Sequence, residues 1–210
     1  MANVDSPFGL KPVGHLLGLD WSGGVRKCYI PSTDSTRAFF IGDVVDLAGS
    51  ADTPAQCPTV TVANVGLATY PIFGVIVGFE PDPDNLSLLY RPDDTNRYCY
   101  VCVDPFVIYE VQASSNAVVA ATAVGVNACL AIAVHSGNTS TGLSGLELDT
   151  GDVSTPAANS TFPLTILGAV NRPGNDISLV NAKWHVMITM HRLLPTYDVG
   201  QTAYTGALGV

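Results

Sequence analysis

The residues that come nearest to a catalytic motif are Asp149-Thr-Gly151, which directly follow Leu146-Glu-Leu148. An Asp-Thr-Gly triplet supplies one of the two aspartates that share a proton in aspartic proteases. This chain carries the triplet once, so protease chemistry would need a homodimer with Asp149 from each subunit. A chance match in a turn is the simpler interpretation. A homodimeric aspartic protease is therefore kept only as the last alternative.

Histidines and cysteines do not predict a metal site. His185 and His191 share one face of an expected strand, but at about 3.3 Å per residue they lie about 20 Å apart. Cys99-Tyr-Val-Cys102 has the spacing of half a zinc site, yet residues i and i+3 of a strand point to opposite faces. We expect no catalytic residue, no metal, no cofactor, and free thiols for all five cysteines.

The charge pattern is unusual for a chain of 210 residues. It has 9 Lys and Arg against 18 Asp and Glu, and charged residues make up only 13%, against about 25% in ordinary soluble domains. So few cations exclude nucleic-acid binding through a basic face. Residues 111–146 contain no Asp, Glu, Lys or Arg. Either this stretch fills a wide core or it lies between subunits, where charge is depleted.

We favour the subunit interface for this charge-free stretch, because a single core rarely takes up so long a run. The residues predicted at that interface are Val118, Val124, Leu130, Ala131 and Ile132. Membrane insertion does not explain the stretch, since its longest apolar run, Ala128–Val134, is far shorter than the roughly 20 residues of a spanning helix. Met1–Asp5 has no feature of a signal peptide, so we expect synthesis in a cytoplasm and no membrane partner.

Short runs rich in β-branched and aromatic residues recur between turn residues. They predict a mainly β fold, an antiparallel β-sandwich, jelly-roll-like or barrel domain. The expected strands are Val25–Ile30, Ala38–Leu47, Thr59–Val65, Ile72–Phe79, Leu86–Tyr90, Tyr98–Val103, Phe106–Val111, Ala128–Val134, Gly145–Leu148, Leu164–Val170 and Leu179–Met190. A single short helix is expected at Val118–Val124, which ends before Gly125.

The two ends of the chain differ from this β-rich middle. Ser6–His15 contains two prolines and two glycines, which disfavour a helix and a regular strand. We therefore predict an extended N-terminal arm over residues 1–24, a β-rich domain over 25–194 and an extended C-terminal tail over 195–210. Pro7, Phe8, Leu10 and Pro12 are the arm residues expected to contact a partner.

Several motifs along the chain resemble a known family. They are Met1-Ala-Asn-Val-Asp-Ser-Pro-Phe-Gly-Leu-Lys-Pro-Val13, Phe40-Ile-Gly-Asp-Val-Val45, Phe73-Gly-Val-Ile-Val-Gly78, Asp104-Pro-Phe106 with Glu110-Val-Gln112, Thr141-Gly-Leu-Ser-Gly-Leu-Glu-Leu-Asp149 and Leu164-Thr-Ile-Leu-Gly-Ala-Val-Asn-Arg-Pro173. In this order they are similar to the capsid decoration, or cement, proteins of tailed bacteriophages. The N-terminal motif is the most specific, and the last sixteen residues have no counterpart.

The resemblance implies a non-enzymatic virion protein on the outer surface of an assembled phage head. Its partners would be the major capsid protein and two further copies of itself in a homotrimer, with Pro7, Phe8, Leu10 and Pro12 as the capsid-contacting arm. The acidic composition suits an exposed virion face. A second alternative is a virion adhesin that binds host-surface glycans through the loop Ser136–Gly142, although this loop lacks the aromatic residues typical of sugar sites.

Overall fold

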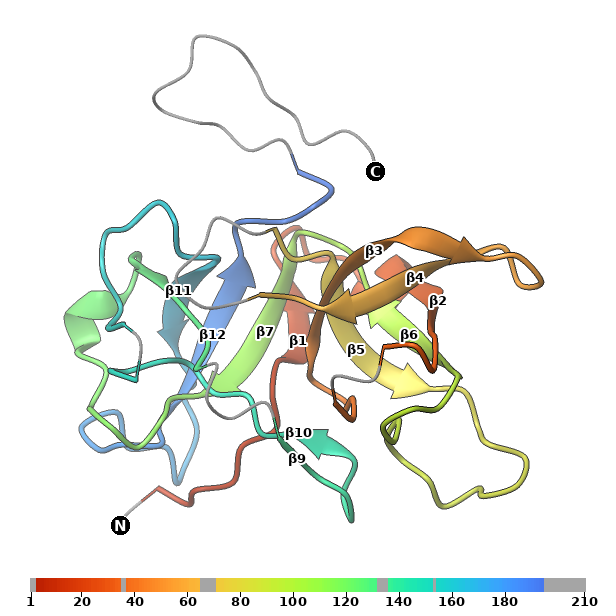
Figure 1. Ribbon diagram of the computed structural model, residues 1–210. Coiled ribbons are helices and arrows are strands. Elements are labelled where there is room, and N and C mark those ends of the chain that lie inside the picture. Colours follow the sequence, from red (N-terminus) through yellow and green to blue (C-terminus); the bar gives the residue numbers. More distant parts are fainter. Residues whose placement is uncertain (1–2, 35–36, 65–70, 132–135, 153, 195–210) are drawn as a thin grey trace, which may run out of the picture.

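Two β-sheets lie side by side and share one hydrophobic core (Figure 1). The structure is a computed structural model that describes residues 3–34, 37–64, 71–131, 136–152 and 154–194. The first sheet is a closed barrel and the second is an open sheet of five strands. The chain enters through the open sheet, builds the barrel, and then returns to complete the open sheet. The mainly β, antiparallel fold is thus as predicted.

The barrel is closed by five strands in the order β2-β4-β3-β5-β6. All neighbours are antiparallel except β2 and β4, which are parallel. Alternation of buried and less buried positions along β2 places Cys28 and Ile30 inside. The strands are β2 (Val25–Ile30), β3 (Val44–Asp52), β4 (Cys57–Val62), β5 (Gly74–Phe79) and β6 (Arg97–Cys102).

The open sheet has the order β1-β7-β12-β11-β8 and is antiparallel throughout. Its strands are β1 (Lys11–His15), β7 (Val107–Gln112), β8 (Asn127–Ala128), β11 (Leu164–Ala169) and β12 (Lys183–Ile188). A separate hairpin pairs β9 (Gly137–Asn138) with β10 (Leu143–Ser144). The described residues also include two 3-10 turns, η1 (Trp21–Gly24) and η2 (Ala121–Ala123).

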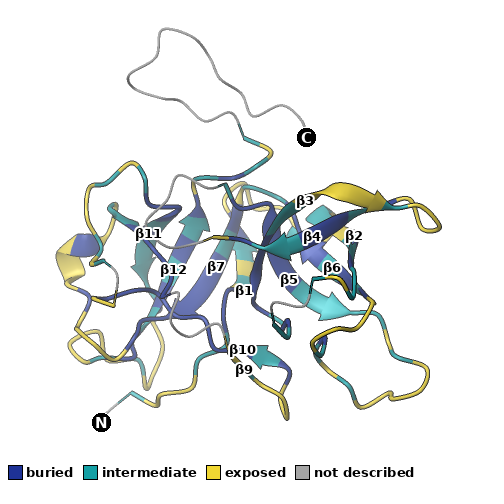
Figure 2. Cartoon of the chain, in the orientation of Figure 1, coloured by how far each residue is buried: buried dark blue, intermediate teal, exposed yellow. Residues whose placement is uncertain are grey.

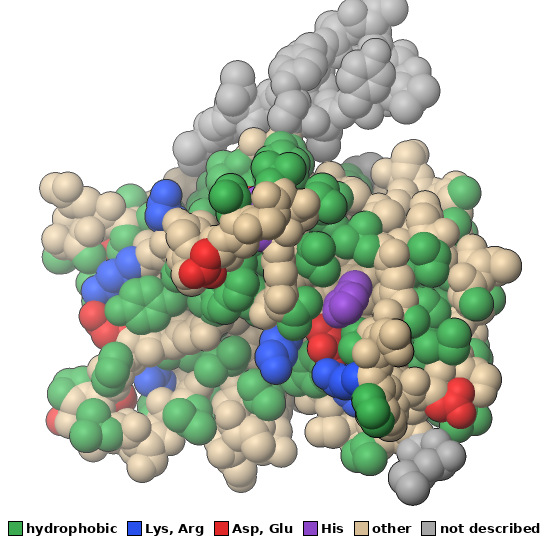
Figure 3. All heavy atoms as spheres, turned by 180° about the vertical axis from the view of Figure 1, so that it is seen from behind, with side chains coloured by type: hydrophobic (Ala, Val, Ile, Leu, Met, Phe, Trp, Pro, Cys, Tyr) green, Lys and Arg blue, Asp and Glu red, His purple; other side chains and the backbone are tan. Residues whose placement is uncertain are grey.

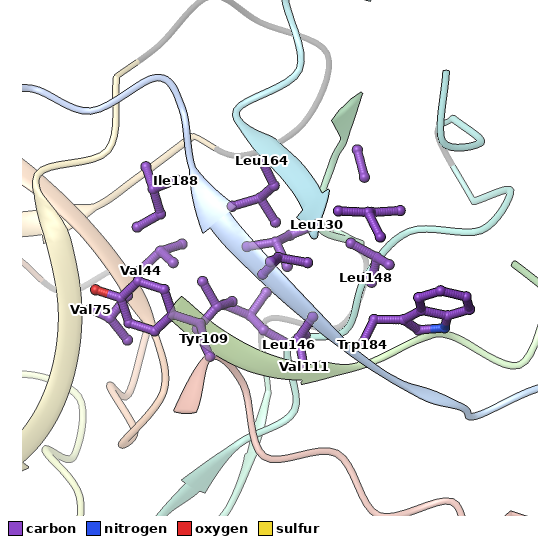
Figure 4. Packing of buried hydrophobic residues seen from close by; sticks show 14 of the residues in the cluster. Val44, Val75, Tyr109, Val111, Leu130, Leu146, Leu148, Leu164, Trp184 and Ile188 are labelled. Carbon is purple, nitrogen blue, oxygen red and sulfur yellow. The ribbon is translucent and has the colours of Figure 1, made fainter. Parts of the chain in front are cut away.

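The shared core is built on β7 and β12. Trp184, Val186 and Ile188 alternate inward along β12. Tyr109 of β7 lies beside Val44 and Val75 of the barrel and so joins the two sheets (Figure 4). Figure 2 shows β7 buried over most of its length, whereas the far part of β3 is exposed. Each large apolar side chain buried here contributes about 1.5–3 kcal/mol.

In the part that the structure describes, the charge-free stretch divides between core and surface. Leu130 and Ala131 are 0% exposed, and Leu146 is fully buried with them. The predicted helix Val118–Val124 is wrong, since only Ala121–Ala123 form a 3-10 turn. Ala120 precedes this turn in an extended conformation, and no side chain caps it. A short alanine-rich run without a cap does not meet the cost of helix nucleation.

The predicted N-terminal arm is not confirmed. Lys11–His15 form β1, which pairs with β7, and Leu10 is only 1% exposed in the shared core. Sequence patterning missed this strand because Pro12 and Gly14 interrupt it, and its register with β7 shifts between these two residues. The predicted strand Leu86–Tyr90 is likewise wrong, because none of these residues forms a strand. The predicted tail over 195–210 lies outside the described residues.

The N-terminal segment passes the barrel at a close backbone contact between two glycines. Gly9 and Gly42 both have positive φ, at +70° and +95°, and their backbone atoms lie against each other. A Cβ atom on Gly9 would lie 2.4 Å from the carbonyl oxygen of Gly42. The amide of Leu10 donates to that same oxygen at 2.9 Å. The crossing therefore leaves no room for any side chain.

Replacing Gly9 with alanine should lower the free energy of unfolding by about 3 kcal/mol or more, because the new methyl group collides with Gly42 and the backbone is strained. Gly18→Ala is a matched control, since Gly18 also has a positive φ, +73°, but has nothing within 4 Å of the added Cβ. It should cost only about 1–2 kcal/mol. Urea unfolding of both variants measures the difference, and equal losses would contradict the close crossing.

Candidate docking surface

Large apolar side chains are exposed where β1 ends. Leu16, Leu17 and Leu19 are 52%, 64% and 64% exposed in the loop after β1. Phe106, in the turn before β7, is 37% exposed, and its carbonyl oxygen accepts from the amide of Leu16 at 2.9 Å. We call Leu16, Leu17, Leu19 and Phe106 the apolar rim. Large apolar residues exposed together in one short loop and the turn bonded to it are typical of a surface that contacts a partner.

A histidine and an aspartate hold the rim in place. His15 Nδ1 accepts from the amide of Leu17 at 3.1 Å, so the proton of a neutral ring is on Nε2. That Nε2 lies 3.1 Å from Asp104 Oδ2 and donates to it. Asp104 Oδ1 in turn accepts from the amide of Phe106 at 2.9 Å. The backbone on both sides of the rim is thus tied to one pair, in which the His15 side chain is buried and Asp104 is partly buried.

His191 is buried next to this region. It is 1% exposed, and its Nδ1 accepts from the amide of Leu193 at 3.1 Å. Desolvation lowers the pKa of His191 to about 4, and the nearby Asp104 carboxylate only partly offsets this effect. The ring is therefore neutral at neutral pH. Sequence spacing gave His191 no role. Its burial after β12, which lowers its pKa, makes it a residue that links folding stability to pH.

The predicted arm residues precede the apolar rim in the chain and are partly or fully buried. Phe8, Leu10 and Pro12 line a groove of about 550 Å³ between the open sheet and the barrel. Phe8 and Pro12 are half-buried, as is Pro7, whereas Leu10 belongs to the core of its own chain. Leu10 is therefore unable to contact a partner while the chain is folded.

The predicted subunit-interface residues separate into two groups. Val118 and Val124 are 45% and 48% exposed around η2, where Val118 lines an uncharged hollow of about 350 Å³. Leu130 and Ala131 are buried inside the chain, so a charge at Ala131 would disturb the core rather than an interface. Ile132 lies outside the described residues. The interface thus remains a prediction at Val118 and Val124.

Asp149 has a structural task in a turn. Its carboxylate accepts from the amides of Gly151, Asp152 and Ser154 at 3.0, 2.8 and 2.7 Å, and the residue is 0% exposed. Three backbone donors are what a capping aspartate needs to hold a tight turn. The Asp-Thr-Gly triplet therefore has a complete explanation in local structure.

The cysteines and the other candidate ligands do not converge. All five cysteines are free and buried, and burial raises the pKa of the Cys28 thiol to about 12. Within the described ranges no three His, Cys, Asp or Glu side chains gather as a metal site would require. None of the helices in those ranges has the length and apolar character that crossing a bilayer demands.

No family model, no curated protein and no solved structure matches the chain. The apolar rim is the feature that sequence reasoning missed. A signal for it exists, because Leu16, Leu17 and Leu19 fall within four positions around Gly18, just after Gly14. Leucines concentrated in a turn-forming segment have no strand or helix to bury them.

The buried His191 predicts a dependence of stability on acid. In the unfolded chain a histidine takes up a proton near pH 6.5, whereas in the folded protein His191 does so only near pH 4. Between these values the unfolded state binds more protons, so stability falls as pH falls through this window, by roughly 3 kcal/mol in all.

Urea unfolding at pH 7.0 and at pH 4.5 checks this, with His191→Gln compared with the wild-type chain. The variant should lose less stability on acidification than the wild type. His185→Gln, on the half-buried outer face of β12, is the control and should behave as the wild type. Identical losses in all three proteins would show that His191 does not carry the effect.

Proposed function

We propose that this protein is a non-enzymatic structural component of a virion. It binds the outer surface of an assembled phage head, as a trimer, and stabilises contacts between major capsid subunits. The observation that carries the proposal is the apolar rim, which is exposed to solvent and whose backbone is tied to His15 and Asp104 at the end of the N-terminal segment. The same N-terminal segment bears the most specific resemblance to phage decoration proteins.

Surface chemistry supports the proposal. Large apolar side chains exposed together are costly unless a partner covers them. The net charge of −9 discourages contact with packaged nucleic acid and suits a face turned to solvent. A trimer would attach through three rims at once, and linkage of three modest contacts greatly increases the overall affinity.

Charge placed on the apolar rim should weaken attachment without unfolding the protein. Leu16→Glu and Leu17→Glu each bury a carboxylate against the shell, so we expect about a tenfold or greater loss of affinity. Co-sedimentation with phage heads stripped of this protein measures the bound fraction. Leu86→Glu, at a 77% exposed leucine in the loop between β5 and β6, is the control and should bind as the wild type. Full binding by both rim variants would refute this docking surface.

Oligomeric state tests the other surface. Light scattering after size exclusion should give three times 21.9 kDa for the wild-type chain. Val118→Glu and Val124→Glu place charges at the predicted interface around η2 and should give monomers with unchanged unfolding midpoints. Leu86→Glu again serves as the control and should remain trimeric. A wild-type monomer in solution, or trimers in both valine variants, would remove η2 from the interface.

A further inference from the structure

The groove beside the N-terminal segment concentrates the basic residues of an acidic protein. Lys11, Lys183 and Arg172 all line it, out of 9 Lys and Arg in the chain. Most of the other basic residues are engaged elsewhere. Arg91 and Arg97 are buried, while Lys27 pairs with Glu80 and Arg192 with Asp46.

Of the three basic residues that line the groove, only Arg172 is in an ion pair. Arg172 is held by Glu110 in a bidentate pair, with N–O distances of 3.1 and 2.6 Å. Glu110 is buried, so this pair also fixes the loop after β11 against the open sheet. Lys11 and Lys183 have no carboxylate within 4.0 Å among the described residues. Two lysines that line the groove are therefore outside any ion pair in the described part of the chain.

The groove is lined by both charged and apolar residues. Its charged residues come from the open sheet and the loop after β11. Its apolar residues come from the N-terminal segment, η1, the loop before β3, the barrel and β10. They are Phe8, Leu10, Pro12, Trp21, Ile41, Ile76, Val77 and Leu143. Figure 3 shows basic side chains around an acidic one near the centre of this face, with hydrophobic side chains adjoining them.

This arrangement selects the shape of a ligand as well as its charge. A detergent-like anion has its charge at one end, whereas here basic residues from three different elements are interspersed with apolar ones around the groove. A polypeptide in extended conformation has side chains that alternate between two sides. A segment in which acidic and apolar residues alternate can therefore place each kind of side chain against lining residues of the complementary kind. The lining is also mostly apolar with few polar groups, as in ligand-binding grooves generally.

Strand addition to β1 does not explain the groove. β1 is the edge of the open sheet, but it carries Lys11, Pro12 and an irregular register, features that protect an edge from pairing. Recognition must therefore come from side chains. We propose that the groove binds an extended segment of a partner protein in which acidic and apolar residues alternate, with Lys11 and Lys183 binding its carboxylates. This site is separate from the apolar rim, and it does not depend on the partner being a capsid.

Trp21 provides a local readout. It is half-buried in the groove, and the only other tryptophan, Trp184, is 0% exposed in the core. We would titrate the full chain with a short synthetic peptide in which glutamate alternates with leucine and phenylalanine, and follow tryptophan fluorescence. Binding should be saturable, weakened by salt, and without signal in Trp21→Phe. Lys11→Glu and Lys183→Glu should each weaken it about tenfold.

Matched controls separate the possible outcomes. Arg26→Glu reverses one exposed charge on β2, away from the groove, and should change the affinity less than twofold. A glutamine version of the peptide and sodium laurate are tested in parallel, and both should bind weakly. Strong binding by the glutamine peptide would overturn the role of charge. Preference for laurate would overturn the peptide as occupant, and no saturable binding, or binding unaffected by both lysine variants, would overturn the site.

Discussion

The back-to-back contact of Gly9 with Gly42 is the constraint on which the rest of the structure depends. It brings the N-terminal segment across the barrel, where Gly42 also donates to Ile76 of β5 at 2.8 Å. This crossing places Leu10 in the core that both sheets share, and it starts β1 at the edge of the open sheet. The groove and the apolar rim lie along the same segment, so both proposed binding surfaces follow from one close approach of two backbones.

The low surface charge has a structural cause as well as a functional one. Several charged side chains serve inside the protein as connectors for loops. The Arg91 guanidinium donates to the carbonyl oxygens of Pro31, Arg37 and Thr95, and Arg97 holds the segment after β5 in the same way. Burial of an arginine is tolerated when its donors are used. A chain with few charges that places some of them inside leaves wide uncharged areas for contact with partners.

Sequence patterning predicted strands whose hydrophobic pattern is complete within the segment and missed those whose pattern is interrupted. β2 was predicted with its observed bounds, because its alternation and flanking turns are complete within the segment. β1 was missed because Pro12 and Gly14 are atypical of a strand. Its strand conformation is stabilised by pairing with β7, far along the chain. The charge-free stretch was interpreted as interface, although Leu130 is core, because sequence alone does not distinguish burial within a chain from burial between chains.

The central claim is that the apolar rim attaches this protein to the outside of a phage head. An electron cryo-microscopy reconstruction of stripped heads incubated with the protein tests it most directly. The account predicts added density on the outer surface, into which the chain fits with the loop after β1 and the turn at Phe106 against the shell. Density in which this rim faces solvent, or heads without added density at saturating protein, would contradict it.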